Sequence, residues 1–148
     1  MIEPQNGGGF NVLLIEDNPG DIRLTQEALH DSEVINKMDV VVDGDEAMRY
    51  LLGKEPFSNN LPPDLILLDL NLPKKNGLEV LHEIKTNARI QHIPVVVLTS
   101  SEAEHDIFES YAAYANCYIS KPVDFEHFSA VIKSIEKFWF NVPKLPTE

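Results

Sequence analysis

Acidic, hydroxyl and amine side chains follow four short apolar runs of this 148-residue sequence. They are Glu16 and Asp17 after Val12–Ile15, Asp69 after Leu65–Leu68, Thr99 after Val95–Leu98, and Lys121 after Tyr118–Ile119. A carboxylate can bind a divalent cation, and beside that cation it can attack phosphorus to form an acyl phosphate. A hydroxyl and an amine can donate to the oxygens of a transferred phosphoryl group. The four positions together predict metal-assisted phosphoryl chemistry.

Clustered carboxylates repel one another, and a cation relieves the repulsion. Mg²⁺ prefers oxygen ligands, keeps several waters and usually pairs with a phosphate. In this interpretation Asp17 and Asp69 bind Mg²⁺ directly, and a backbone carbonyl near Asn71 adds a third ligand. Glu16 acts through a water molecule.

Each of these residues also has an ordinary structural interpretation. Asp17 alone fits a solvated turn acid, Thr99 a helix-entry residue, and Lys121 a surface cation. Their common position at the ends of successive apolar runs favours a shared site over four coincidences.

The apolar runs predict the strands that position these residues. Leu65–Leu68 is continuously apolar, which is typical of a strand buried on both faces of a parallel sheet. Five such runs, including Val40–Val42, alternate with amphipathic segments and predict an α/β fold with βα repeats. Ligands of open parallel sheets bind beyond the carboxyl ends of the strands. We therefore expect the reactive groups to meet at one edge of the sheet.

The amphipathic segments have recognisable starts and apolar faces. Predicted helix N-caps are Asn18, Asp43, Asn76 and Ser101. The fifth helix has the clearest apolar face, made of Phe125, Phe128, Val131, Ile132, Ile135 and Phe138. Residues 53–63 are predicted to form a long exposed loop.

Composition excludes several classes of protein. The 12 basic and 24 acidic side chains give a net charge of −12, which argues against nucleic acid or an anionic membrane as a partner. No apolar stretch approaches the roughly 20 residues of a membrane helix, and the first residues do not form a secretory signal. Cys117 is the only cysteine, so an intramolecular disulfide is excluded. The expected location is the cytoplasm.

The motifs resemble those of the receiver domains of two-component response regulators, the CheY-like superfamily. The matching segments are IEDN (15–18), LILLDLNLP (65–73) with NG at 76–77, VVVLTSS (95–101) and YISKP (118–122). The resemblance implies a single flavodoxin-like (βα)5 doubly wound parallel sheet with strand order 2-1-3-4-5. The match predicts a receiver domain at 10–138. The polar, glycine-ending residues 1–9 are expected to form a flexible tail, and residues 139–148 an apolar extension.

The resemblance also implies a role for each site residue. Asp69 is the expected phosphoacceptor for a histidine kinase, and the protein is not expected to be an enzyme beyond its own phosphorylation and dephosphorylation. Glu16 and Asp17 are the expected acid pair, with Mg²⁺ bound by Asp17, Asp69 and the carbonyl of Asn71. Thr99 and Lys121 are expected to contact the phosphoryl group, and Pro122 to follow a cis bond. Tyr118 is either a switch aromatic coupled to Thr99 or an ordinary half-buried tyrosine.

Further segments resemble the stand-alone regulators of cyanobacterial phytochromes. They are the stretch 56–81, the stretch NARIQHIPVVVLTSS and the terminal FWF. The implied phosphodonor is a phytochrome-type histidine kinase, and the implied output is a contact between proteins. The apolar extension either packs on its own domain or contributes to a homodimer through the fourth helix, fifth strand and fifth helix, and the dimer is favoured. Sedimentation with and without residues 139–148 tests this expectation.

Two other functions remain as alternatives. A haloacid-dehalogenase-type phosphatase also uses an Asp nucleophile and Mg²⁺, and Asp69-Leu70-Asn71 faintly matches its Asp-x-Asp motif. However, Asn71 lacks the carboxylate that would serve as general acid and base. An inactive receiver used only for protein interaction is the other alternative, although no chemically required side chain is missing.

Overall fold

The computed structural model describes residues 10–30, 32, 35–73, 76–99 and 117–135. In this part of the chain, five parallel strands form one sheet in the order β2-β1-β3-β4-β5, which confirms the predicted flavodoxin-like α/β fold. The strands are β1 (Phe10–Ile15), β2 (Ile35–Val41), β3 (Leu65–Asp69), β4 (Val95–Thr99) and β5 (Cys117–Ser120). The described helices are α1 (Pro19–Leu29), α2 (Gly44–Leu51), α3 (Gly77–Lys85) and α5 (Phe125–Ile135). The helix expected after Ser101 lies outside the described residues.

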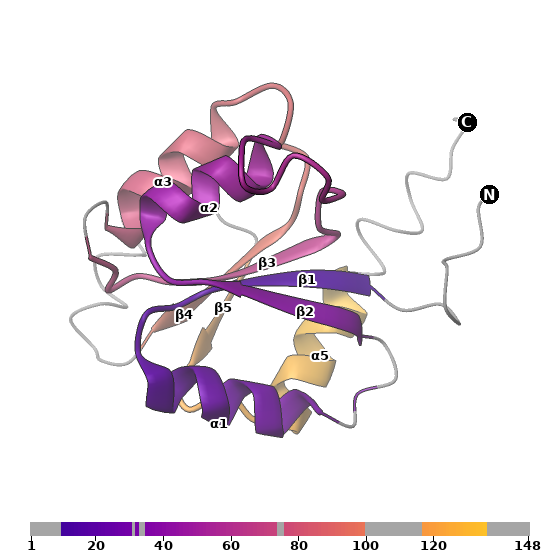
Figure 1. Ribbon diagram of the computed structural model, residues 1–148. Coiled ribbons are helices and arrows are strands. Elements are labelled where there is room, and N and C mark those ends of the chain that lie inside the picture. The colour runs from indigo at the N-terminus through magenta and orange to yellow at the C-terminus, as the bar shows by residue number, and fades with distance from the viewer. Residues whose placement is uncertain (1–9, 31, 33–34, 74–75, 100–116, 136–148) are drawn as a thin grey trace, which may run out of the picture.

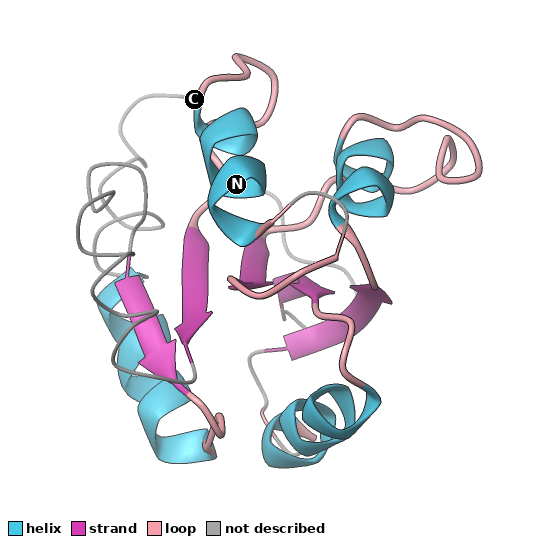
Figure 2. Cartoon of the chain, turned by 90° about the vertical axis from the view of Figure 1, so that its left-hand side faces the viewer, coloured by secondary structure: helices cyan, strands magenta, loops and turns pink. Residues whose placement is uncertain are grey.

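Helices cover both faces of the sheet. In Figure 1, α2 and α3 lie on one face, and α1 and α5 lie on the other. Figure 2 shows the same layers after a turn of 90°. Neighbouring strand residues point to opposite faces, so each strand supplies two separate cores. In β3, Ile66 and Leu68 join the core beneath α2 and α3, whereas Leu65 and Leu67 join the core beneath α1 and α5.

This two-sided burial explains the continuous apolar runs. All five residues of β3 are buried, including Asp69 at its carboxyl end. A strand in the middle of the sheet has no face to present to water, so it cannot alternate apolar and polar residues. Asp69 therefore enters the interior as the last residue of a strand that is otherwise entirely apolar.

Three predicted N-caps are confirmed. The side chain of Asn18 accepts a hydrogen bond from the backbone N–H of Asp21 at 2.9 Å, and Asp43 caps α2 in the same way. Asn76 and Glu79 form a reciprocal capping box at the start of α3, with both N···O distances 3.0 Å. These caps fix the first residues of the helices. The helix α1 therefore begins shortly after β1, and α3 begins beyond the end of β3.

Two details of the sequence prediction are wrong. The second strand was expected at Val40–Val42, but β2 starts at Ile35 and Val42 lies beyond its end. Its first five residues, INKMD, are not an apolar run, because β2 is an edge strand whose backbone pairs with β1 alone. Phe125 was expected on the inner face of the fifth helix, but it is 46% exposed. It is the first residue of α5, and the helix reaches the core only at Phe128.

The loop between α2 and β3 is largely exposed, as predicted. Phe57 is half-buried, because its ring packs against the buried Tyr50 with a distance of 5.2 Å between ring centroids, and Pro63 is buried. The Tyr50 hydroxyl donates to the Asp39 carboxylate on β2. Burial and this carboxylate raise the pKa of Tyr50. The packing of Phe57, the burial of Pro63 and the hydrogen bond from the Asp64 backbone N–H to the Asn11 carbonyl hold the loop against the body of the protein.

The predicted terminal segments, 1–9 and 139–148, lie outside the described residues, so their boundaries stay predictions. The last position of the predicted α5 apolar face, Phe138, also lies outside them. Within the described part of the chain, no helix has the length and apolar character needed to cross a membrane.

Candidate functional site

A pocket lies at the carboxyl-terminal edge of the sheet, where the sequence predicted a site. Its volume is about 350 Å³. The described residues that line it are Glu16, Asp17, Asn18, Asp21, Asp69, Asn71, Leu72, Pro73 and Lys121. Four of these residues are acidic and one is basic, so the lining carries a strong excess of negative charge. Such a pocket attracts cations.

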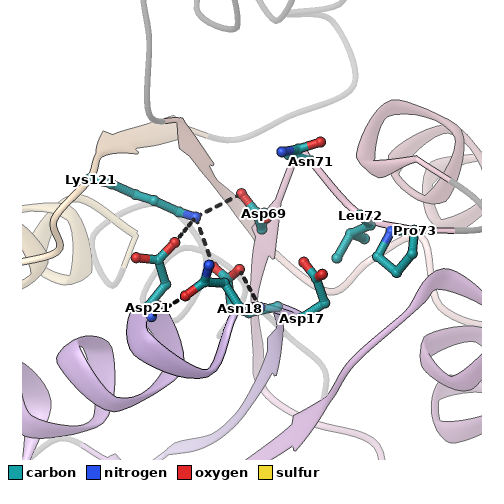
Figure 3. Close-up of a pocket in the computed structure, with 9 residues that line it drawn as sticks. Asp17, Asn18, Asp21, Asp69, Asn71, Leu72, Pro73 and Lys121 are labelled. Carbon is teal, nitrogen blue, oxygen red and sulfur yellow. Dashed lines mark hydrogen bonds and ion pairs between the residues drawn. The ribbon is translucent and has the colours of Figure 1, made fainter.

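The Lys121 ammonium is surrounded by three carboxylates. Its Nζ lies 2.9 Å from Glu16 Oε1, 2.9 Å from Asp21 Oδ2 and 3.0 Å from Asp69 Oδ1. The side chains of Glu16 and Asp69 are only 1% and 3% exposed. Figure 3 shows Lys121 reaching across the pocket to these acids, with Asp17 on the far side, near Leu72 and Pro73.

Two turns bring Lys121 and Asp69 to this place. Lys121 directly follows β5, and the Lys121-Pro122 peptide bond is cis, as predicted. Asp69 ends β3, and the chain then turns into α3. The backbone N–H of Gly77 donates to the carbonyl of Leu70 at 3.0 Å, so the start of α3 is held against the end of β3.

The acids fit a divalent cation. Ligand oxygens of Glu16, Asp17 and Asp69 all lie within 4.8 Å of one another. Glu16 Oε1 and Asp69 Oδ1 are buried, and the Lys121 ammonium lies within reach of both. Buried carboxylate oxygens without donors are costly, and either an ammonium or a metal ion offsets that cost. Carboxylate oxygens are the ligands that hard cations prefer.

Burial changes the acidity of the two innermost acids. Burial raises the pKa of Glu16 from 4.5 to about 7, although Lys121 opposes the rise, and the charge of Asp69 adds to it. Burial also raises the pKa of Asp69, again against the opposing effect of Lys121. For Lys121 itself, burial would lower the pKa, but the three carboxylates outweigh it and the pKa is raised. The ammonium therefore stays charged at neutral pH.

We predict that the metal-free protein loses stability as pH rises from about 4.5 to 7. The folded-state pKa of Glu16 lies above its unfolded value of 4.5, so ionisation is harder in the folded state. The stabilising contribution is present below pH 4.5 and is lost as pH rises through about 7. We expect urea unfolding in EDTA to show a loss of roughly 2–3 kcal/mol, measured as wild type minus Glu16→Gln. A difference that is constant or grows with pH would contradict the assignment.

The structure brings together most of the predicted site residues. Glu16, Asp17, Asp69, Asn71 and Lys121 all line the pocket. The backbone of Thr99 ends β4 and pairs with that of Ser120, but its side chain lies outside the described part of the structure. Tyr118 lies on β5 with 39% of its surface exposed. Its predicted switch role, and the roles of the other site residues, stay predictions.

Sequence reasoning missed Asp21 and the pocket position of Asn18. A signal was present, because Asn18-Pro19 predicts the start of a helix and places Asp21 at its third position. An acid in the first turn of a helix that begins directly after Glu16 and Asp17 lies beside them in space.

The fold and the pocket define a doubly wound α/β protein with an acidic, lysine-containing site at the carboxyl ends of its strands. A family model described as the response regulator receiver domain matches residues 12–133. The chain belongs to this family. Response regulator Rcp1 from Synechocystis sp. (strain PCC 6803) is 44% identical over 135 residues, which are 91% of this chain and 92% of that protein.

Solved structures give the same result. The crystal structure of the phosphorylated cyanobacterial phytochrome response regulator RcpA is 48% identical, with a TM-score of 0.73, and the match covers 95% of this chain and 100% of that one. The Mn²⁺-bound form of response regulator Rcp1 is 43% identical, with a TM-score of 0.69, and the match covers 93% and 99%. The resemblance predicted from the motifs, including the likeness to phytochrome regulators, is confirmed.

Proposed function

We propose that this protein is a phosphoacceptor of a two-component phosphorelay, with Asp69 as the acceptor. One observation carries the proposal. The Asp69 carboxylate lies 3.0 Å from the Lys121 ammonium, inside a pocket that also holds Glu16 and Asp17. This arrangement supports the proposal, because transfer needs a nucleophile, a cation and an amine for the phosphoryl group within one small volume.

In the proposed reaction, an Asp69 oxygen attacks the phosphorus of a phosphohistidine on the kinase. A P–O bond forms as the P–N bond breaks, and the histidine nitrogen leaves with the electron pair of that bond and takes up a proton. Lys121 stabilises the negative charge on the phosphoryl oxygens. Thr99, at the end of β4, supplies a second donor in this proposal.

The cation in this proposal is Mg²⁺. Asp17, Asp69 and the carbonyl of Asn71 hold it, and Glu16 acts through water. When bound, Mg²⁺ offsets the charge of the acids and of the incoming phosphoryl group. The likeness to a Mn²⁺-bound relative supports a divalent ion at this site.

Labelling with a small phosphodonor tests the proposed acceptor. We expect wild type incubated with acetyl phosphate and Mg²⁺ to acquire one base-labile phosphoryl group, because an acyl phosphate hydrolyses readily in base. Intact-mass measurement detects this label as an increase of about 80 Da, the mass of one phosphoryl group. Asp69→Asn removes the nucleophilic oxygen and should abolish the increase.

Asp64→Asn is the matched control, because Asp64 is exposed at the opposite end of β3. If wild type acquires no label, the remaining alternative is an inactive receiver that is used only for protein interaction. Turnover of a phosphate ester without a stable label would instead favour the phosphatase alternative.

The proposed donor is a phytochrome-type histidine kinase. The support is the similarity to Rcp1 and to RcpA, the latter described as a cyanobacterial phytochrome response regulator. Timed phosphotransfer from candidate kinases tests it, and we expect the fastest transfer from a phytochrome kinase. Equal rates from unrelated kinases would contradict this choice.

The proposed output is a conformational change in which Thr99 moves to the phosphoryl group and Tyr118 turns inward. Its support is the partial exposure of Tyr118, on the strand next to β4. Tyr118→Ala should keep phosphorylation but uncouple it from homodimer formation or partner binding. Normal coupling, measured by sedimentation with and without phosphodonor, would exclude the switch.

A further inference from the structure

Among the described residues, Asp21 is a third carboxylate in contact with Lys121, beside Glu16 and Asp69. Its Oδ2 accepts a hydrogen bond from Lys121 Nζ at 2.9 Å. Glu16 Oε1 and Asp69 Oδ1 lie equally close, at 2.9 and 3.0 Å, and also bind the ammonium. A charge-assisted hydrogen bond fixes the direction of the N–H group that makes it.

The carboxylate of Asp21 is itself held in place. Its backbone N–H is bonded to the Asn18 side chain at 2.9 Å, in the first turn of α1. Pro19 at the start of the same turn restricts the backbone further. Figure 3 shows this short chain of contacts, from Asn18 through Asp21 to Lys121, along one wall of the pocket.

We propose that Asp21 is a positioning residue that holds the Lys121 ammonium in place for phosphoryl transfer to Asp69. This inference rests on the proposed function of the pocket. A lysine side chain has many rotamers, and transfer needs its ammonium at one place. Glu16 and Asp69 are less suited to this task, because one belongs to the cation site and the other carries the phosphoryl group. Asp21 remains available throughout the reaction.

A positioning role predicts that removing Asp21 slows labelling, whereas the negative charge of Asp21 alone predicts the opposite change in rate. A negative charge at the pocket repels an anionic phosphodonor, so a purely electrostatic role means that its removal accelerates labelling. Asp21→Asn and Asp21→Ala remove the same charge, but only asparagine keeps a side-chain oxygen that can accept from Lys121. The difference between these two variants therefore measures the hydrogen bond alone.

The test is the initial rate of labelling by acetyl phosphate with Mg²⁺. We expect Asp21→Ala to be slower than wild type by about five- to tenfold, and Asp21→Asn by about twofold. Glu27→Gln is the control, because Glu27 lies on the same helix, pairs with Arg23 and is exposed. Its rate should equal that of wild type. Asp21→Ala at or above the wild-type rate, or equal rates for the two Asp21 variants, would overturn the proposal.

The ¹⁵N NMR signal of the Lys121 ammonium provides a second readout that does not depend on phosphorylation. A held ammonium exchanges its protons slowly, so we expect a resolved signal in wild type, Asp21→Asn and Glu27→Gln, and loss of the signal in Asp21→Ala. An unchanged signal in Asp21→Ala overturns the inference. If wild type takes no label, the proposed function fails, and the NMR comparison still decides whether Asp21 holds Lys121.

Discussion

Lys121→Met should destabilise the metal-free protein by about 3–5 kcal/mol at pH 8, because it leaves buried carboxylates without their cation. The ammonium lies within 3.0 Å of Glu16 and Asp69, whose side chains are almost completely buried. Methionine is similar in length but carries no charge. The raised pKa of Lys121 means that its stabilising contribution is fully present at pH 8 in wild type and is lost only in strong base.

Two conditions should restore part of the stability that Lys121→Met loses. Acidification protonates the two carboxyls, whose pKa values are already raised by burial, so the gap between variant and wild type should narrow toward pH 5. Added Mg²⁺ should narrow it as well, because a cation again faces the acids. Urea unfolding at pH 8 and pH 5, each with EDTA or Mg²⁺, measures both effects.

Lys133→Met is the matched control for this experiment. Lys133 is exposed on α5, so the same substitution should change stability by no more than about 0.5 kcal/mol. If Lys121→Met is as stable as Lys133→Met in EDTA at pH 8, the three-carboxylate contact is not what holds the pocket together.

Gly77→Ala should cost about 2–3 kcal/mol and should also weaken metal binding. A Cβ at this position would lie 2.4 Å from the Cα of Leu70 and 2.6 Å from the carbonyl oxygen of Asp69. Both are backbone atoms, so the start of α3 must move away from the end of β3. That movement breaks the hydrogen bond from the Gly77 backbone N–H to the Leu70 carbonyl. It also displaces Asn71, which lines the pocket.

Gly20→Ala is the comparison for Gly77→Ala. It makes the same substitution in the first turn of α1, where the nearest contact of a new Cβ is the Asn18 side chain at 3.2 Å. The Asn18 oxygen that caps α1 must shift by a few tenths of an ångström, and alanine favours a helix over glycine by up to about 1 kcal/mol, so the two effects oppose each other. We expect little change or a small gain for Gly20→Ala. Equal losses of unfolding free energy in Gly77→Ala and Gly20→Ala, measured with urea, would contradict the close approach of α3 to β3. An unchanged Mg²⁺ affinity of Gly77→Ala, measured by calorimetry, would contradict it as well.

The central strands could be predicted because two-sided burial leaves a clear pattern in the sequence. Leu65–Leu68 of β3 each face one of the two cores, so this run could only be apolar, and Asp69 at its end was conspicuous. The edge strand β2 could not be predicted in full. It pairs on one side only, and its first residues are set by pairing with β1 rather than by burial.

The site could be predicted where its residues follow strands directly, and not where a helix contributes. Glu16, Asp69 and Lys121 each lie within one residue of a strand end, and parallel strands bring such ends together. Asp21 belongs to the first turn of α1, and its contact with Lys121 spans 100 residues of sequence. The cap at Asn18 places Asp21 beside Glu16 and Asp17, but its contact with Lys121 depends on the angle at which α1 leaves β1, and no local pattern specifies this angle.

The loop between α2 and β3 joins the sheet at the edge opposite the pocket, because it enters β3 at Leu65 while Asp69 ends that strand. Residues 58–61 of this loop are exposed, and Phe57 and Asn60 connect the loop to Tyr50 of α2. A short peptide tag or a fluorescent label attached between Ser58 and Leu61 would thus report on the molecule from a position remote from its reacting groups. Lengthening this loop adds little closure entropy, so the protein can carry such a probe at small thermodynamic cost.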